Sequence, residues 1–140
     1  MRALTVQGPW AMQIMEGTKT IEYRTWKTDY RGDILITSSA KRFRDCICGY
    51  ALCVVELYDI TPRLAPEIYT GEMMFAGEYE WHLRDVRAIK PFPIKGKLNL
   101  WNTDVEGKLE FKPHFPKGGS EETAWVAENI IPLIYVPRKR

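Results

Sequence analysis

The sequence predicts a β-rich α+β fold, built as a small β-barrel or strongly curved sheet with short helices. About six segments are β-prone, either as alternating apolar and polar residues or as apolar runs, and only short helical segments lie between them. The chain has 140 residues, of which 45% are hydrophobic and 12% aromatic, enough for one packed core. Because compact domains cluster near ~100–150 residues, we expect residues 1–140 to form a single domain.

Hydrophobic periodicity places the first elements. Residues 3–7 alternate as a strand, and Pro9 then fits the first turn of a short helix that Gly17 ends. Residues 20–26 alternate strictly, which predicts a second strand with one polar face. The side chains on that polar face are Glu22, Arg24 and Trp26.

The middle of the chain is expected to contain the longest strands. Residues 33–37 indicate a buried strand, and residues 49–60 an apolar-rich strand that Thr61 and Pro62 end. Residues 65–77 are expected to be irregular, and residues 78–89 to form another long strand.

The last third of the chain predicts shorter elements. Two prolines within residues 91–97 indicate a loop or edge segment. The remaining expectations are a helical turn at 98–101, a short strand within 107–115, a helix capped by Ser120, a strand at 130–136 and a solvated tail at 138–140.

Composition and hydropathy exclude several classes of protein. The chain is neither disordered, collagen-like nor a disulfide-built miniprotein. No apolar run approaches the roughly 18–20 residues that a transmembrane helix needs, so no membrane partner is expected. The N-terminal residues do not resemble a signal peptide, and we expect a cytoplasmic protein. The cysteines and histidines lack metal-ligand spacing, so reduced thiols, no metal and no cofactor are expected.

The formal net charge of +2 hides an uneven distribution. Residues 1–50 carry eight basic and five acidic residues, residues 51–85 carry two and seven, and residues 86–140 carry ten and six. Two basic ends around an acidic middle can give the molecule one positive face. By itself this distribution favours a polyanionic partner only modestly.

The most informative segment is residues 7–26, where polar and planar side chains gather near the start of a strand. In order, they are Trp10, Lys19, Glu22, Arg24 and Trp26. A carboxylate accepts hydrogen bonds from exocyclic amines, Arg and Lys contact phosphate or carbonyl oxygens, and tryptophan offers a stacking face. These residue types suit a planar, polar ligand that carries phosphate, as nucleotides do.

The same segment resembles the ASCH domain, a family in the PUA-like superfamily of small β-barrels. The family signature Gly-x-Lys-x-x-Glu-x-Arg corresponds to Gly17, Lys19, Glu22 and Arg24. A second similar block lies within residues 92–101, so the resemblance covers about residues 1–102 and leaves 103–140 as an unmatched extension. The resemblance implies a PUA-like small β-barrel with short helices and a cleft where the motif side chains converge.

The leading hypothesis is a domain that binds RNA or a nucleotide, with DNA as an alternative polymer, as the resemblance to PUA-like domains implies. Trp10 or Trp26 would stack on a base, Glu22 would accept a hydrogen bond from a base amine, and Lys19 and Arg24 would hold the backbone. A positive rim would follow the phosphates. The rim residues are Lys41, Arg42, Arg44, Lys95 and Lys97.

Two other functions remain open. Some small ASCH proteins are amidohydrolases that remove an acetyl group from the exocyclic amine of cytidine, using the motif lysine, a threonine in place of the motif glutamate, and a separate glutamate. An amidohydrolase acting on N4-acylated cytidine, or a ribonuclease, would use Lys19 and Glu22 as catalytic residues, although position 22 is Glu here rather than Thr. Alternatively, residues 65–77 and 103–140 would form the surface of a protein-interaction module. The sequence does not indicate the base that is recognised or the oligomeric state.

Overall fold

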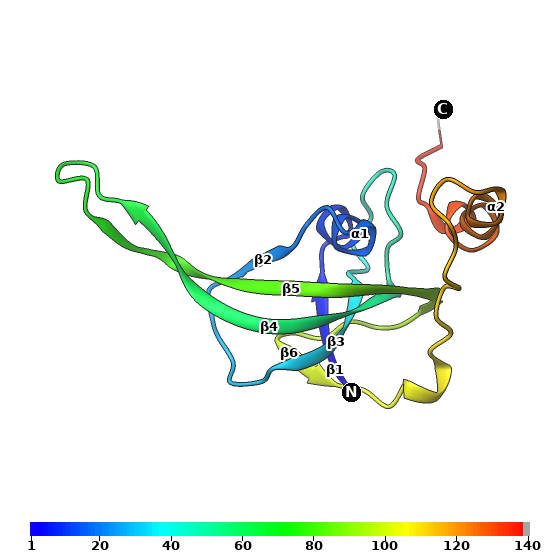
Figure 1. Cartoon of the computed structure of the whole chain (residues 1–140), viewed down its shortest axis with the longest axis horizontal. Coiled ribbons are helices and arrows are strands. Elements are labelled where there is room, and N and C mark those ends of the chain that lie inside the picture. The colour runs from blue at the N-terminus through cyan, green and yellow to red at the C-terminus, as the bar shows by residue number, and fades with distance from the viewer. Residues whose placement is uncertain (139–140) are drawn as a thin grey trace.

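The computed structural model describes residues 1–138 and consists mainly of one six-stranded mixed sheet (Figure 1). Across the sheet the order is β2-β5-β4-β3-β1-β6, with β1 and β3 parallel and all other neighbours antiparallel. This architecture confirms the predicted β-rich α+β class. The strands are β1 (Arg2–Val6), β2 (Ile21–Arg24), β3 (Gly32–Ser38), β4 (Tyr50–Pro66), β5 (Met73–Pro93) and β6 (Leu100–Asn102).

Short helices complete the fold within residues 1–138. Helix α1 begins with proline in its first turn and ends at Gly17, whose φ of 83° is the left-handed conformation that glycine adopts without strain. Its buried side chains include Ala11, Met12 and Ile14, so this helix covers one face of the sheet. The helices are α1 (Gly8–Glu16), α2 (Ser120–Asn129) and the 3-10 helices η1 (Glu106–Lys108) and η2 (Ile131–Leu133).

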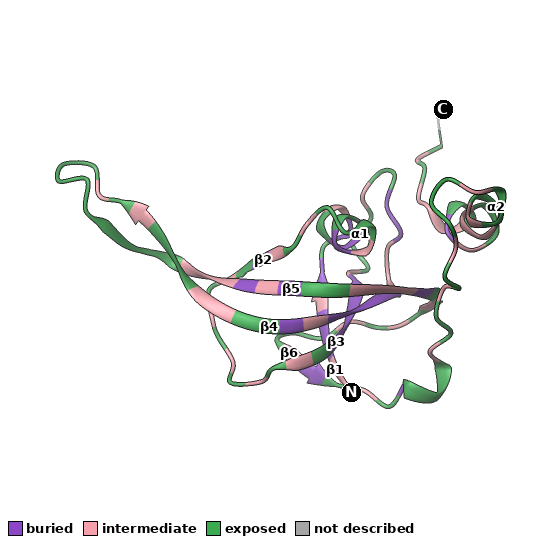
Figure 2. Cartoon of the chain, in the orientation of Figure 1, coloured by how far each residue is buried: buried purple, intermediate pink, exposed green. Residues whose placement is uncertain are grey.

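Buried residues make up much of β1, β3 and β4, drawn purple in Figure 2, and they divide between two separate core clusters. Because alternate residues of a strand point to opposite faces, Leu4 and Ile34 belong to the core beneath α1, whereas Ala3 and Leu35 belong to a second cluster. The C-terminal helices pack against the first cluster, with Trp125 among the contributing residues.

The β4–β5 hairpin is longer than expected. The strand end predicted at Thr61 and Pro62 is wrong, and the irregular structure predicted at 65–77 is confirmed only for residues 67–72. Strand β4 continues to Pro66, and β5 already begins at Met73. Strand β3 pairs with β4 only as far as Leu57. Beyond that residue β4 is an edge strand, where proline is tolerated because no neighbour needs its missing N–H group.

Several C-terminal predictions are also wrong. Residues 98–101, expected to be helical, contribute to β6, because the free edge of β1 pairs with them. By contrast, residues 91–93, expected in a loop or edge segment, form the end of β5, where β4 is the one named strand within residues 1–138 that pairs with them, as for an edge segment. The expected strands at 107–115 and 130–136 are reduced to isolated bridges at Phe111 and Ile134. Pro132 in η2 explains the second case, because proline cannot donate to a strand ladder.

Two smaller differences concern the ends of the last helix and of the chain. Helix α2 begins at Ser120 itself, and Gly119 takes the N-cap position that was expected for Ser120. Of the tail expected at 138–140, residues 139–140 lie outside the described residues.

Candidate functional site

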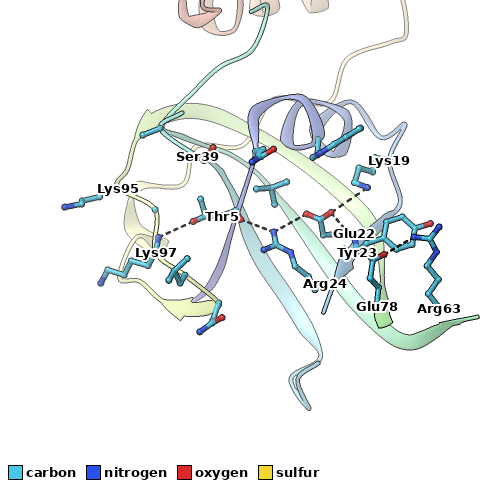
Figure 3. Close-up of a pocket in the computed structure, with 17 residues that line it drawn as sticks. Thr5, Lys19, Glu22, Tyr23, Arg24, Ser39, Arg63, Glu78, Lys95 and Lys97 are labelled. Atoms are coloured by element: carbon cyan, nitrogen blue, oxygen red, sulfur yellow. Dashed lines mark hydrogen bonds and ion pairs between the residues drawn. The ribbon is translucent and has the colours of Figure 1, made fainter. Parts of the chain in front are cut away.

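A cleft of about 1010 Å³ opens beside the edge strand β2 (Figure 3). It is formed by the end of β1, the start of α1, β2, the β4–β5 hairpin and the loops that contain Lys19, Ser39 and Lys95. The lining residues are Thr5, Val6, Gln7, Trp10, Lys19, Glu22, Tyr23, Arg24, Ser39, Ala40, Arg63, Glu78, Lys95, Gly96, Lys97, Leu98 and Asn99.

The buried carboxylate of Glu22, which is only 6% exposed, lies at the centre of the cleft wall. Arg24 Nη2 donates to Glu22 Oε2 at 3.1 Å, and the Lys19 ammonium lies 3.7 Å from Oε1. The backbone N–H of Tyr23 also donates to Oε1, at 3.1 Å. A buried carboxylate needs such partners, so Glu22 holds Lys19 and Arg24 in fixed positions.

Arg24 joins two strands that are not neighbours in the sheet. Its Nη2 also donates to the carbonyl oxygen of Thr5 in β1, at 3.0 Å. Strands β5, β4 and β3 lie between β2 and β1 in the sheet order. The sheet must therefore curl strongly to bring Arg24 to Thr5, and this curl forms the cleft between them.

Aromatic rings and further cations form the outer part of the cleft. Trp10 is 48% exposed and Tyr23 is 41% exposed, and the Lys19 ammonium lies 5.4 Å and 5.3 Å from their ring centroids. The Arg63 guanidinium lies 4.9 Å from the Tyr23 centroid and forms an ion pair with Glu78 at 2.9 Å. The cleft therefore presents two partly exposed rings, each with a cation lying against it.

A close backbone approach positions the loop of residues 95–99. The backbone N–H of Lys97 and the indole N–H of Trp101 both lie 3.3 Å from Thr5 Oγ1 and donate to it. A Cβ atom on Gly96 would lie 2.6 Å from Thr5 Cγ2, which real side chains do not allow. Only glycine at position 96 lets the loop approach β1 and bring Lys95 and Lys97 to the cleft.

One buried polar group of the cleft is unsatisfied. Ser39 Oγ is buried and finds no hydrogen-bond partner within residues 1–138. Buried hydroxyl groups are nearly always hydrogen-bonded, so this atom is a candidate contact for a ligand.

Most of the predicted ligand-binding residues line this one cleft. They are Trp10, Lys19, Glu22, Arg24 and Lys95. The predicted rim residue Lys97 lines it too.

Other predicted residues lie outside the cleft lining. Strand β2 ends at Arg24, so the alternation expected through residue 26 stops early. The ring of Trp26 instead packs edge-on against Trp81, with 4.7 Å between the ring centroids. Lys41 and Arg42 are exposed and lie beside Phe43 and Tyr135, with 5.2 Å and 5.3 Å to the ring centroids. Arg44 is exposed as well.

The sequence analysis missed other lining residues. Arg63 follows the expected end of one strand, and Glu78 begins the strand expected at 78–89. Their ion pair across the hairpin follows only from the way the two strands pair. Their opposite charges on either side of residues 64–77 were the available signal. Tyr23 alternates with Glu22 along β2, yet it still reaches the cleft at the edge of the sheet.

The fold and the cleft define the class of the protein: a β-rich α+β domain whose curled sheet presents cations and exposed aromatic rings. The sequence model of the ASCH domain matches residues 4–93. The match covers more than half of the chain, which therefore belongs to the ASCH-domain family and has the PUA-like fold. The match includes the motif from Gly17 to Arg24 and ends before Lys95, a shorter span than the expected 1–102. A search of curated proteins gave no match.

Residues 1–138 contain no helix that is long and apolar enough to cross a membrane. They contain no group of three or more His, Cys, Asp or Glu side chains that could hold a metal ion. Cys53 is fully buried, and this burial raises the pKa of its thiol to about 12, so the thiol stays protonated at neutral pH.

Proposed function

We propose that the cleft binds nucleic acid, specifically single-stranded RNA or a nucleotide. The observation that carries the proposal is the gathering of two exposed rings, Trp10 and Tyr23, with several cations around one cleft. Proteins that bind single strands combine a positive groove with aromatic stacking platforms. Membership of the ASCH-domain family supports the same function.

The charge balance of the cleft supports an anionic ligand. Glu22 and Glu78 are the acidic lining residues, and both are already paired with cations. The basic lining residues outnumber them; they are Lys19, Arg24, Arg63, Lys95 and Lys97. This excess of positive charge favours phosphate groups.

The geometry supports distinct roles for the lining residues. Trp10 would stack on a base, and Lys95 and Lys97, on an exposed loop, would contact phosphates. Glu22 was expected to accept a hydrogen bond from a base amine. Because both of its oxygens already have partners from the chain, we assign it instead to positioning Lys19 and Arg24.

Fluorescence anisotropy with a labelled single-stranded RNA tests the proposal. Affinity should fall as salt rises, with a log–log slope of about −0.7 per phosphate contact. Trp10→Ala should weaken binding about 5- to 150-fold, because stacking on an aromatic ring contributes about 1–3 kcal/mol per base. The matched control is Tyr58→Ala, which removes a ring that is 42% exposed but lies outside the cleft lining. Absence of binding at low salt, or equal losses in both variants, would contradict the proposal.

The Glu22→Gln variant distinguishes a role of Glu22 in positioning Lys19 and Arg24 from a purely electrostatic effect on RNA binding. The substitution makes the cleft more positive, so charge alone predicts tighter RNA binding. If Glu22 positions Lys19 and Arg24, affinity should fall instead, because their ion pairs are lost. The same titration measures both outcomes, and tighter binding would rule out the positioning role.

A second candidate function is hydrolysis of N4-acylated cytidine, which one observation favours. Glu78 lines the same cleft as Lys19 and could serve as the separate glutamate of the ASCH amidohydrolases. Incubation with N4-acetylcytidine, followed by chromatography, should then release cytidine and acetate with wild-type protein but not with Lys19→Ala. A parallel incubation with labelled RNA tests ribonuclease activity. Lack of turnover in both incubations would exclude the enzyme functions.

A further inference from the structure

The outer part of the β4–β5 hairpin projects from the rest of the molecule as a two-stranded arm, defined here as residues 63–78 (Figure 1). The last β2–β5 pair joins Arg24 to Tyr79, and the last β3–β4 pair joins Gly32 to Leu57. Beyond these pairs the two strands of the arm pair only with each other. A two-stranded ribbon alone is marginally stable in water, so the arm is a candidate for docking.

One face of the arm is apolar and uncovered. The register places Leu64 opposite Phe75 and Pro66 opposite Met73, so these four side chains share a face. Leu64, Met73 and Phe75 are 53%, 59% and 52% exposed. Figure 2 shows the arm as intermediate and exposed, in contrast to the central strands.

The tip of the arm, residues 67–72, combines exposed apolar side chains with negative charge. Ile68 and Tyr69 are 90% and 92% exposed and lie between Glu67 and Glu72. The Glu67 carboxylate accepts hydrogen bonds from the backbone N–H groups of Thr70 and Tyr69, at 2.7 Å and 2.9 Å. These bonds fix the turn and, with that of Thr70 contributing most, lower the pKa of Glu67, so its charge persists at neutral pH.

The loop of residues 95–98 has the opposite character. Leu98 is 90% exposed, as much as Ile68, and it directly follows Lys97, with Lys95 nearby. The close contact of Gly96 with Thr5 fixes this loop to β1. Among the described residues, Leu98, Ile68 and Tyr69 are the three most exposed large apolar side chains. The tip and the loop therefore carry opposite charges, and each also exposes apolar side chains.

We propose that two copies of the chain associate reciprocally, the tip of each arm docking on the 95–98 loop of the other copy. Opposite charges then surround the buried apolar contacts on both sides of the interface. A reciprocal exchange of this kind closes with two-fold symmetry. Contact between two tips is disfavoured, because it would bring Glu67 and Glu72 of both copies together. The proposal does not rest on RNA binding, but the two use the same loop: Lys95 and Lys97, which the proposed function assigns to phosphates, would lie in the dimer contact, so RNA and a second copy would compete for it.

Sedimentation equilibrium of the full chain tests the proposal. Wild-type protein should reach the mass of a dimer as its concentration rises, and added salt should weaken the association. Protein that stays monomeric at every concentration would overturn the proposal. The arm tip would then need a different partner, such as a basic loop of another protein.

Charge-swapped variants locate the contact. The arm variant Glu67→Lys/Glu72→Lys and the loop variant Lys95→Glu/Lys97→Glu should each dimerise at least about 100-fold more weakly, because like charges then meet at the interface. An equimolar mixture should restore the dimer, since both reciprocal contacts again join opposite charges. A loop variant that dimerises like wild type, or a mixture that stays monomeric, would overturn the proposal.

Two further variants control for indirect effects. Lys108→Glu/Lys117→Glu makes the same change of charge at exposed lysines outside the loop, and it should leave the dimer intact. Because Glu67 also fixes the turn, Tyr69→Ser tests the arm with both glutamates in place, and it should weaken the dimer. Dimerisation unaffected by Tyr69→Ser would contradict docking through the tip.

Discussion

The inner and outer halves of the β4–β5 hairpin use similar residue types but differ in burial. In the inner half Trp81 is 0% exposed, covered by neighbouring strands and the core beneath α1. In the arm Phe75 is 52% exposed, although it pairs with Leu64 across the same hairpin. Backbone pairing satisfies both halves, so the difference comes from the elements packed against them. Hydrogen bonding extends a strand, but only neighbouring elements make it part of a core.

The largest expected difference is between truncating an aromatic residue in each half. Trp81→Ala should lower the free energy of unfolding by about 3–5 kcal/mol, because it leaves a cavity and removes the hydrogen bond to the Trp26 carbonyl. Phe75→Ala in the arm should change it by less than about 0.5 kcal/mol in the monomer. Urea denaturation at low protein concentration measures both. Comparable losses would mean that the arm packs against the core in solution.

An intermediate effect is expected where the chain leaves the inner half. Gly96→Ala should cost about 1–3 kcal/mol in unfolding free energy, because the new Cβ atom would meet Thr5, which is tied to Thr37 by a 2.9 Å hydrogen bond. Gly107→Ala is the matched control, since nothing lies within 4 Å of its Cβ position. Thermal denaturation compares the two variants. Equal stability would show that the 95–99 loop moves without cost.

The smallest effect concerns the ion pair that joins β3 to the inner half of β5. Arg87 donates two hydrogen bonds to Asp33, at 2.6 Å and 2.9 Å, and these bonds hold the pKa of Asp33 below its usual value of 3.8. The pair therefore stabilises the fold at pH values above about 4, and this contribution is lost as the pH falls through the lowered pKa.

Asp33→Asn should accordingly lower stability at pH 7 by about 0.5 kcal/mol, a modest value because the Asp33 side chain is 50% exposed. The difference between the variant and wild type should shrink as the pH falls below 3.8 and through the lowered pKa of Asp33. Urea denaturation at pH 7 and at a series of lower pH values checks this, with Glu121→Gln, at an exposed glutamate in α2, as the control. A difference that persists at low pH would show that the carboxylate charge is not its source.

The sequence predicted correctly those elements that depend on residues close together in the chain. Alternation identified β1, an apolar run identified β3, and proline and glycine placed α1 within one residue of its observed ends. The spacing of Lys19, Glu22 and Arg24 also indicated a common site, because their positions relative to one another depend on one short strand and its start.

Features that depend on distant parts of the chain could not be predicted in this way. Pro62 is compatible with a strand only because β3 has already ended, and Trp26 leaves the cleft because β2 stops at Arg24. Arg63 and Glu78 reach the cleft through the register of a hairpin that the sequence did not indicate. In each case the decisive interaction joins residues that are far apart in the sequence.

The hydrogen bond from Arg24 to the Thr5 carbonyl has a mechanical consequence. It joins the edge strand β2 to β1 across the cleft. The same guanidinium therefore lines the site and holds two of its walls together. A phosphate that binds Arg24 would interact with the same guanidinium that makes this hydrogen bond. We therefore expect ligand binding in the cleft to slow amide hydrogen exchange along the whole of β2, even at residues that do not contact the ligand.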